Sequence, residues 1–193
     1  MAREQRLAPD ARREQLLASG RAYFGEHGYG EASLDVLAKE VGVSKALLYH
    51  YFGGRRGYFL ATVEELATRL EATFNPPAGL PFEEKLRASL GAFCLVAEGD
   101  RGIFRTFLRG GLGADEDVAN VVGRVREYAS KALAKELGIS RPSRKLRIAL
   151  AGSVGYVESA TLAWLDEGAK DREAHVRAMQ HVVTLALIAS QDA

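Results

Sequence analysis

The sequence predicts an all-α protein of about nine helices. Apolar residues recur at spacings of three and four along almost every long stretch, whereas the strict alternation that marks strands is rare. The five prolines stand at the edges of these stretches rather than inside them. Together these patterns divide the 193 residues into helices joined by short connections.

Each helix has its own start or stop signal. The first is expected from about residue 10 to Gly28 or Gly30, because glycine commonly ends a helix. Prolines separate the fourth helix from the fifth, and a run of three acids from Asp115 favours the start of the seventh. The other expected helices cover residues 33–40, 45–51, 55–73, 82–98, 101–109, 115–137, 143–167 and 171–190.

Composition excludes several classes of protein. Lys and Arg number 26 against 25 Asp and Glu, so the net charge is +1, and a single Cys cannot form an internal disulfide. No Cys/His cluster has metal-ligand spacing, which argues against a zinc module. The charged N-terminal residues lack the apolar stretch of a signal peptide, so we expect a cytoplasmic protein.

Residues 148–165 require a choice between two interpretations. Glu158 is the single charged residue in this segment, and about 18 apolar residues is the lower limit for crossing a bilayer. The segment is short, rich in Gly, Ser and Thr, and interrupted by that carboxylate. We therefore expect a buried helix, apolar all round, in a soluble protein without membrane contact.

Residues 33–52 have the pattern of two short helices that cross over a tight turn. Ala38 offers the small side chain needed where the second helix approaches the first, and Gly42 can adopt the positive φ that ends the first helix sharply. Ser44 can then cap the second helix. The apolar seam between them consists of Leu37, Val41, Val43, Leu48 and Tyr51.

The second of these helices is suited to the major groove of DNA. From residue 41 to 58 the chain carries Lys45, Arg55, Arg56 and His50 and no acid. Its exposed positions are expected to be Lys45, Ala46, Leu47, Tyr49 and His50. The plainer alternative is an ordinary helical hairpin with a solvated cationic face, but the turn and the seam agree at once with a helix-turn-helix.

At this point the sequence resembles the TetR-type bacterial transcriptional repressors. The resemblance covers about residues 10–60, in FGEHGYGEAS, LDVLAKEVGVSKALLYHYF and GGRRGYFLATVEEL. The positions that carry it are Phe24, Gly28, Tyr29, Ser33, Ala38, Gly42, Val43, Ser44, Leu48, Tyr49 and Phe52. It implies a homodimer with an N-terminal DNA-binding domain and a helical ligand-binding and dimerisation domain.

The resemblance also implies roles for individual residues. Ser33 matches a phosphate-binding Ser or Thr, and Arg55 stands where a Lys commonly contacts phosphate. Lys45, Ala46 and His50 fall where base edges are read, whereas Tyr49 and Tyr51 fall at backbone or thymine-methyl contacts. Ser44 and Arg56 complete the expected DNA-binding set.

Three positions depart from the family pattern. Ala32 stands where Thr is frequent, and Ala46 stands where Gly or Thr is frequent. Arg56 stands where an acid is frequent. The first departure removes a possible phosphate contact, which Arg56 is expected to restore. Arg3 and Arg6 could follow phosphates or a minor groove, although a frayed solvated tail is the simpler interpretation.

Residues 57–193 contain no motif of an enzyme. The sequence contains no GxSxG, GxxxxGK, HExxH or dinucleotide-binding GxGxxG motif, so no catalytic residue, cofactor or metal is assigned. His175 and His181 are out of phase on a helix and do not form a metal pair. Cys94 lies in an apolar stretch and is expected in the core.

Aromatic and polar residues in the apolar helices predict a ligand cavity. A carboxylate in an apolar helix is costly unless it is paired, protonated, at a wet interface or facing a ligand, which makes Glu158 the most informative member. The alternative is that the aromatic residues simply form the core. The expected lining is Phe93, Phe104, Phe107, Tyr128, Tyr156, Glu158, Thr161 and Trp164.

The last two helices are expected to form the dimer interface. Small residues at Gly152, Gly155, Ser159 and Ala163 make a stripe that another helix can approach closely. The final helix is expected to present Val176, Met179, Val183, Leu187 and Ile188 on one side. Two long apolar helices from each subunit would give a four-helix interface.

The sequence thus predicts a homodimeric repressor with a DNA-binding domain at residues 1–56 and a ligand-binding and dimerisation domain at residues 57–193. It would bind a pseudo-palindromic double-stranded DNA operator and leave it on binding a small apolar or amphipathic effector. Two alternatives stay open. One is a ligand-independent regulator or activator, and the other is an all-α small-molecule carrier or enzyme.

Overall fold

A computed structural model describes residues 9–110 and 115–190, and all regular secondary structure in those two stretches is helical. The prediction of an all-α fold is therefore confirmed. Arg3 and Arg6 lie outside the described residues. The nine described helices are α1 (Pro9–Glu31), α2 (Leu34–Val41), α3 (Lys45–Phe52), α4 (Arg55–Thr73), α5 (Phe82–Gly99), α6 (Arg101–Gly110), α7 (Glu116–Glu136), α8 (Arg144–Asp166) and α9 (Arg172–Ala189).

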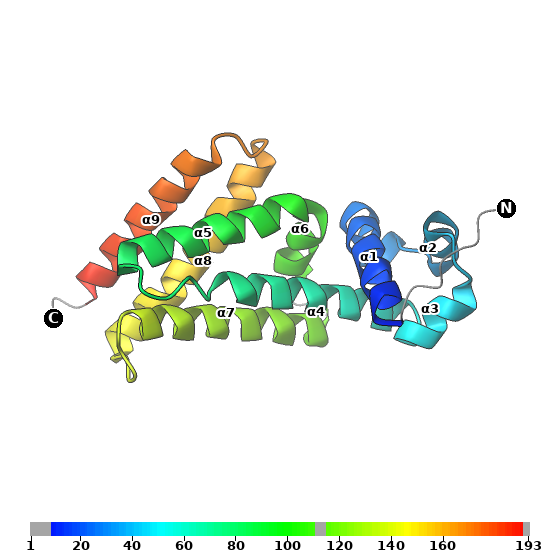
Figure 1. Ribbon diagram of the computed structural model, residues 1–193, viewed down its shortest axis with the longest axis horizontal. Helices are drawn as coiled ribbons and strands as arrows, with labels where there is room; N and C mark the ends of the chain where they lie inside the picture. The colour runs from blue at the N-terminus through cyan, green and yellow to red at the C-terminus, as the bar shows by residue number, and fades with distance from the viewer. Residues whose placement is uncertain (1–8, 111–114, 191–193) are drawn as a thin grey trace.

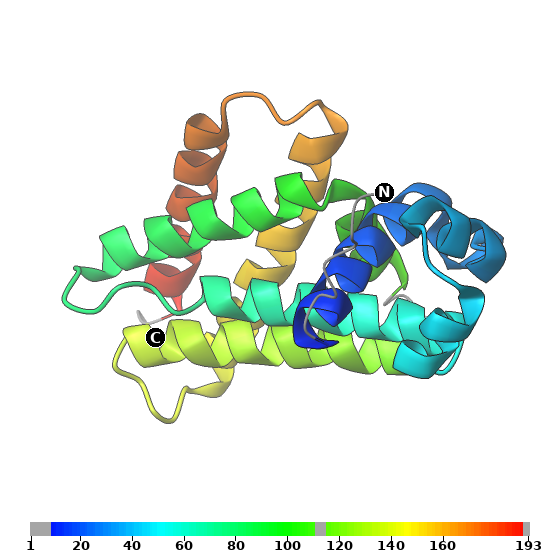
Figure 2. The ribbon, with the colours of Figure 1, turned by 45° about the vertical axis from the view of Figure 1, so that its right-hand side comes forward.

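The helices form a small end piece and a larger bundle (Figure 1). Helices α1 to α3 make the end piece, while α4 runs along the length of the molecule into the bundle with α7 beside it. Helix α6 faces α1, and α9 packs against α5 and α8, as the turned view also shows (Figure 2). Helix α4 therefore belongs to both parts.

The expected stop and start signals operate in the structure. Gly28 breaks the regular geometry of α1 with φ 66° and ψ 174°, although the helix resumes as far as Glu31. The Asp115 carboxylate caps α7 by accepting a hydrogen bond from the Asp117 N–H at 3.0 Å. These local signals place the helix ends within a few residues of their expected positions.

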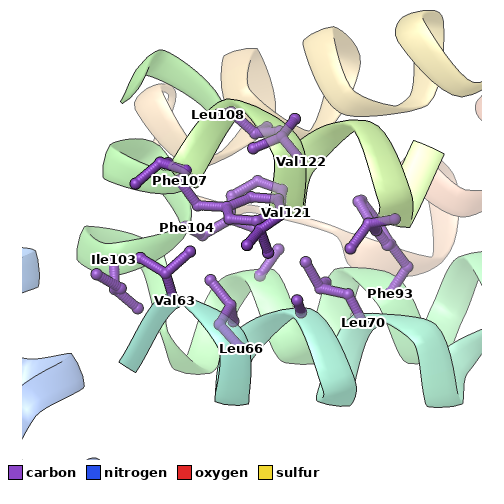
Figure 3. Packing of buried hydrophobic residues seen from close by; sticks show 14 of the residues in the cluster. Val63, Leu66, Leu70, Phe93, Ile103, Phe104, Phe107, Leu108, Val121 and Val122 are labelled. Carbon is purple, nitrogen blue, oxygen red and sulfur yellow. The ribbon is translucent and has the colours of Figure 1, made fainter. Parts of the chain in front are cut away.

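The bundle core is built around two phenylalanines of α6. Phe104 and Phe107 are fully buried and point between α4 and α7 (Figure 3). They belong to the same buried cluster as Leu66 from α4 and Val121 from α7, and Phe104 packs edge-to-face against Phe93 with ring centres 5.6 Å apart. Helix α6 is thereby fixed against the connecting helix α4.

Helix α8 is less buried than its composition suggests. Its length and apolar character are sufficient for crossing a membrane, with a mean hydropathy of 1.3, but 39% of that apolar window is buried in the fold. One face packs inside, whereas Ile148 on the other is 65% exposed. The expectation of a helix buried all round is wrong for the single chain, because no described helix of the chain covers the second face. The expected small-residue stripe lies on that uncovered side, with Gly155 half-buried and Gly152, Ser159 and Ala163 exposed.

Helix α9 also divides differently from the prediction. The apolar set expected for the interface is mostly buried within the chain, at Val176, Met179, Val183 and Leu187. Helices α5 and α8 are the neighbours that cover this face. Ile188, the fifth member of the expected set, is exposed, and the other large exposed apolar side chains of α9 are Val182 and Leu185. The sequence could not separate the two faces because both are apolar.

Candidate functional site

The turn between α2 and α3 has the geometry that the sequence predicts for a helix-turn-helix. Gly42 adopts the left-handed conformation, with φ 70° and ψ 32°, and ends α2. The Val43 N–H then bonds the buried Ala38 carbonyl at 2.9 Å. Ser44 caps α3, its hydroxyl accepting a hydrogen bond from the Leu47 N–H at 3.2 Å. Both short helices are thereby fixed in orientation.

Aromatic side chains of α1, α3 and α4 pack under the helix-turn-helix, and these contacts were not predicted from the sequence. The Tyr23 hydroxyl accepts a hydrogen bond from the Ser33 N–H at 2.9 Å and donates one to the Ser33 carbonyl at 3.2 Å, which holds the start of α2 against α1. Phe52 at the end of α3 stacks in parallel on Tyr58 of α4, with ring centres 4.1 Å apart. Tyr58 is fully buried, and its hydroxyl bonds the Leu16 carbonyl. The adjacent aromatic residues Tyr23 and Phe24 of α1 are the feature of the sequence that could have indicated this packing.

Helix α3 presents most of the expected DNA-reading face to solvent. Lys45, Ala46, Tyr49 and His50 are exposed, with Tyr49 at 51%. Leu47 was also expected outside, but it is half-buried. Tyr51 is half-buried as well, with its ring packed edge-to-face on His50 at 5.6 Å.

The face is not free of acids, which corrects the sequence interpretation. Lys45 Nζ lies 2.9 Å from Asp35 Oδ2, and both side chains are largely exposed. This ion pair raises the pKa of Lys45, chiefly through its hydrogen bond to Asp35. The acid comes from α2, so an inspection of residues 41–58 alone could not find it. Any phosphate that meets Lys45 competes with Asp35.

The exposed Arg55 is held by contacts at the end of α1. Its guanidinium donates a hydrogen bond to the Ala32 carbonyl at 2.9 Å and lies over the Tyr29 ring, 4.7 Å from its centre. The residue remains exposed, and a guanidinium has five donors, so a phosphate contact is compatible with this pose. Ser33 stands at the first position before α2, and its side chain makes no capping hydrogen bond.

Arg56 connects the end piece to the bundle. Its guanidinium lies 3.3 Å from Asp115 Oδ1 and forms a shorter ion pair with Asp117, both at the start of α7. These acids raise the pKa of Arg56. The residue expected to restore a phosphate contact therefore has protein partners already, and these partners are 59 and 61 residues away in the sequence.

A cavity of about 80 Å³ lies between the end of α4 and helices α5, α7 and α8. Its wall is mostly apolar, with Phe74 from the end of α4 and Phe93 from α5. Two of the eight predicted lining residues, Phe93 and Glu158, belong to it. The charged residues of its lining are Lys85, Glu136 and Glu158.

The other six predicted lining residues lie elsewhere. Phe104 and Phe107 fill the core beside α4, and Thr161 is buried with its hydroxyl 3.7 Å from Met179 Sδ. Tyr156 is half-buried. Tyr128 is 37% exposed and exchanges hydrogen bonds with Asn75, at 3.0 and 3.2 Å. Trp164 stacks on His175 at 4.9 Å and donates its indole N–H to the Lys170 carbonyl at 2.6 Å.

Glu158 is explained by a partner on α7. Arg126 Nε lies 3.0 Å from both carboxylate oxygens of Glu158, and a second nitrogen lies 2.8 Å from Oε2. Bidentate pairing of this kind stabilises a carboxylate in an otherwise apolar helix. The carboxylate therefore does not require a cationic ligand, which was one of the explanations open to sequence reasoning.

Cys94 has no sign of reactivity. The thiol is buried, and burial raises its pKa to about 11. The protonated thiol is a poor nucleophile, so the side chain acts as a core residue.

Comparisons with known proteins match both parts of the chain. Residues 16–62 match the model of bacterial regulatory proteins of the tetR family, and residues 82–186 match the Tetracyclin repressor-like C-terminal domain. The fold and the helix-turn-helix thus define a DNA-binding transcriptional regulator. The chain belongs to the TetR family.

Three known proteins illustrate what the chain is similar to. The HTH-type transcriptional activator FasR of Mycolicibacterium smegmatis is 26% identical over 170 residues, which cover 85% of this chain and 77% of the relative. A TetR-family regulator from Streptomyces coelicolor has a TM-score of 0.84 at 24% identity, covering 95% of this chain and 83% of its own. FadR from Bacillus subtilis, solved in complex with stearoyl-CoA, has a TM-score of 0.69 at 16% identity, covering 90% and 97%.

Proposed function

We propose that this TetR-family regulator is a cytoplasmic, non-enzymatic homodimeric repressor that a small apolar or amphipathic effector releases from its operator. The observation that supports this most directly is the course of α4. This helix begins at Arg55 beside the DNA-reading helix and ends next to Phe74, which lines the apolar cavity. One helix therefore connects the two sites.

Coupling between the sites follows from the size of the cavity. A volume of about 80 Å³ is well below the 300 to 1,000 Å³ of most drug-sized ligand sites. An effector larger than this space must displace part of the wall, and the end of α4 is one such part. A dimer reads two half-sites about 34 Å apart, so a shifted α4 would misplace its recognition helix.

The exposed apolar faces of α8 and α9 support the dimer. Ile148 on α8 and Leu185 and Ile188 on α9 are all more than half exposed, at 65%, 52% and 51%. Contiguous exposed apolar surface commonly marks a protein interface. We propose a domain boundary between residues 56 and 57, within the first turn of α4.

A DNA-binding experiment tests the proposed contacts. Genomic fragments that the protein retains first define the operator. His50→Ala should then change sequence preference, with each lost base contact costing about 1 to 3 kcal/mol. Arg55→Ala should weaken binding to all sequences alike and lower the salt slope by about one.

Arg144→Ala is the matched control for charge, because this exposed arginine is the first residue of α8. Helix α8 lies in the bundle, away from α3 (Figure 1). Thermal unfolding of Arg55→Ala checks that losing the Ala32 and Tyr29 contacts has not disordered the end piece. Unchanged operator affinity in folded Arg55→Ala and His50→Ala proteins would reject both contacts.

The second candidate function is activation of transcription instead of repression, because the relative FasR is named an activator. In vitro transcription from the retained promoter separates the two. A repressor lowers transcript yield when added without effector, whereas an activator raises it.

A further inference from the structure

We infer that the cavity selects an uncharged effector, a slender apolar chain with one hydrogen-bonding group that meets Ser153. The inference rests on the proposed effector role of the cavity and specifies the chemistry of its ligand. The observations that carry it are an unpartnered hydroxyl in the wall and the pairing of every charge in the lining.

Ser153 carries a hydroxyl that lacks a partner. The residue is 4% exposed, lines the cavity from α8, and its Oγ has no hydrogen-bond partner among the described residues. A buried hydroxyl without a partner costs free energy, which a ligand group in the cavity would recover. Ser89 also lines the cavity but is half-buried, so it keeps contact with solvent.

The charges of the lining are compensated within the protein. Lys85 Nζ lies 2.6 Å from Glu136 Oε2, with both side chains 22% exposed. Glu158 holds its bidentate pair with Arg126. A cationic or anionic ligand group would therefore enter an apolar space without an available counter-charge, which is strongly unfavourable.

The Ser153 hydroxyl can both donate and accept a hydrogen bond. It therefore suits an alcohol or a carbonyl group on the ligand. The apolar remainder of the wall suits a hydrocarbon chain, and the small volume favours a narrow one.

Four probes of equal chain length test this class by calorimetric titration, namely 1-octanol, octane, octanoate and octylammonium. We expect 1-octanol to bind most tightly and the two ions at least about tenfold more weakly. Ser153→Ala should reduce 1-octanol affinity about fivefold, the loss of one hydrogen bond, and leave octane affinity unchanged. Ser140→Ala is the control, since it makes the same change at an exposed position outside the cavity lining.

Several results would overturn the inference. These are equal or tighter binding of either ion, a 1-octanol preference that survives Ser153→Ala, and no binding of any probe. A separate operator-retention assay examines the proposed function. If 1-octanol binds through Ser153 yet DNA affinity stays constant, the ligand class stands and the switch fails.

Discussion

Gly25 of α1 and Gly102 of α6 pack backbone against backbone where the two helices cross. A Cβ on Gly102 would lie 2.6 Å from the Gly25 carbonyl oxygen, and a Cβ on Gly25 would lie 2.6 Å from the Ile103 nitrogen. Beside this crossing Arg21 of α1 donates to Asp100 at 2.9 Å, and Asp100 also pairs with Arg69 of α4. The end piece is therefore tied to α6 as well as to α4.

Substituting the crossing glycine should loosen this tie. Gly102→Ala puts a methyl group into the Gly25 backbone, so the helices must separate, and we expect a loss of about 1 to 3 kcal/mol in unfolding free energy. The melting temperature should fall by several degrees. Gly91→Ala is the control, because a Cβ there meets no atom within 4 Å. Equal melting temperatures for the two variants would contradict the close crossing.

Arg56 has two possible roles, a phosphate contact on DNA and an ion pair that ties the end piece to α7, and two variants distinguish them. If the residue meets DNA, Arg56→Ala should lower the salt slope of DNA binding by about one. Asp117→Asn should then strengthen binding, because it frees Arg56 from one acid. If Arg56 acts only as a tether to α7, both variants should change DNA affinity in the same direction with an unaltered salt slope. Titrations at several salt concentrations measure both quantities.

The proposed dimer is best tested on surface residues. Leu185→Glu or Ile148→Glu places a charge on the exposed apolar faces of α9 or α8, and we expect monomers in sedimentation velocity. Removing α9 altogether would be a poorer test, because it deletes the buried Val176 and Met179 and uncovers the faces of α5 and α8 against which α9 packs. Leu95→Glu serves as the control, since Leu95 is 54% exposed on α5. Dimeric Leu185→Glu and Ile148→Glu proteins would move the interface elsewhere.

His175 should make stability depend on pH. Burial lowers the pKa of His175, so the unfolded chain binds a proton more readily than the folded chain does. The contribution of neutral His175 to the free energy of unfolding is therefore complete above the unfolded pKa of about 6.5. It is lost as pH falls towards the folded pKa. His175→Phe keeps a ring beside Trp164 but cannot titrate, and it should flatten the unfolding free energy between about pH 7 and pH 5. The control is His181→Gln, at an exposed position of the same helix, which should retain the wild-type pH profile.

The sequence determined the helices and the helix-turn-helix. Gly42, Ser44 and Asp115 act through groups within a few residues of themselves, by a left-handed turn or by a cap. Such interactions depend on local spacing, so they can be predicted from the sequence alone. The family resemblance rests on the same local positions and does not depend on the C-terminal bundle.

Tertiary structure decided which side chains meet. Asp35 reaches Lys45 because α2 and α3 cross, and Asp117 reaches Arg56 because α7 lies beside α4. Six of the eight expected lining residues lie outside the cavity. Five of the six are aromatic, and an aromatic residue in an apolar helix serves a core and a ligand wall equally well. The buried and exposed faces of α8 and α9 are both apolar, so hydrophobic periodicity could not assign them. Only the packing of distant helices, which fixes what each face touches, separates core, cavity and uncovered surface.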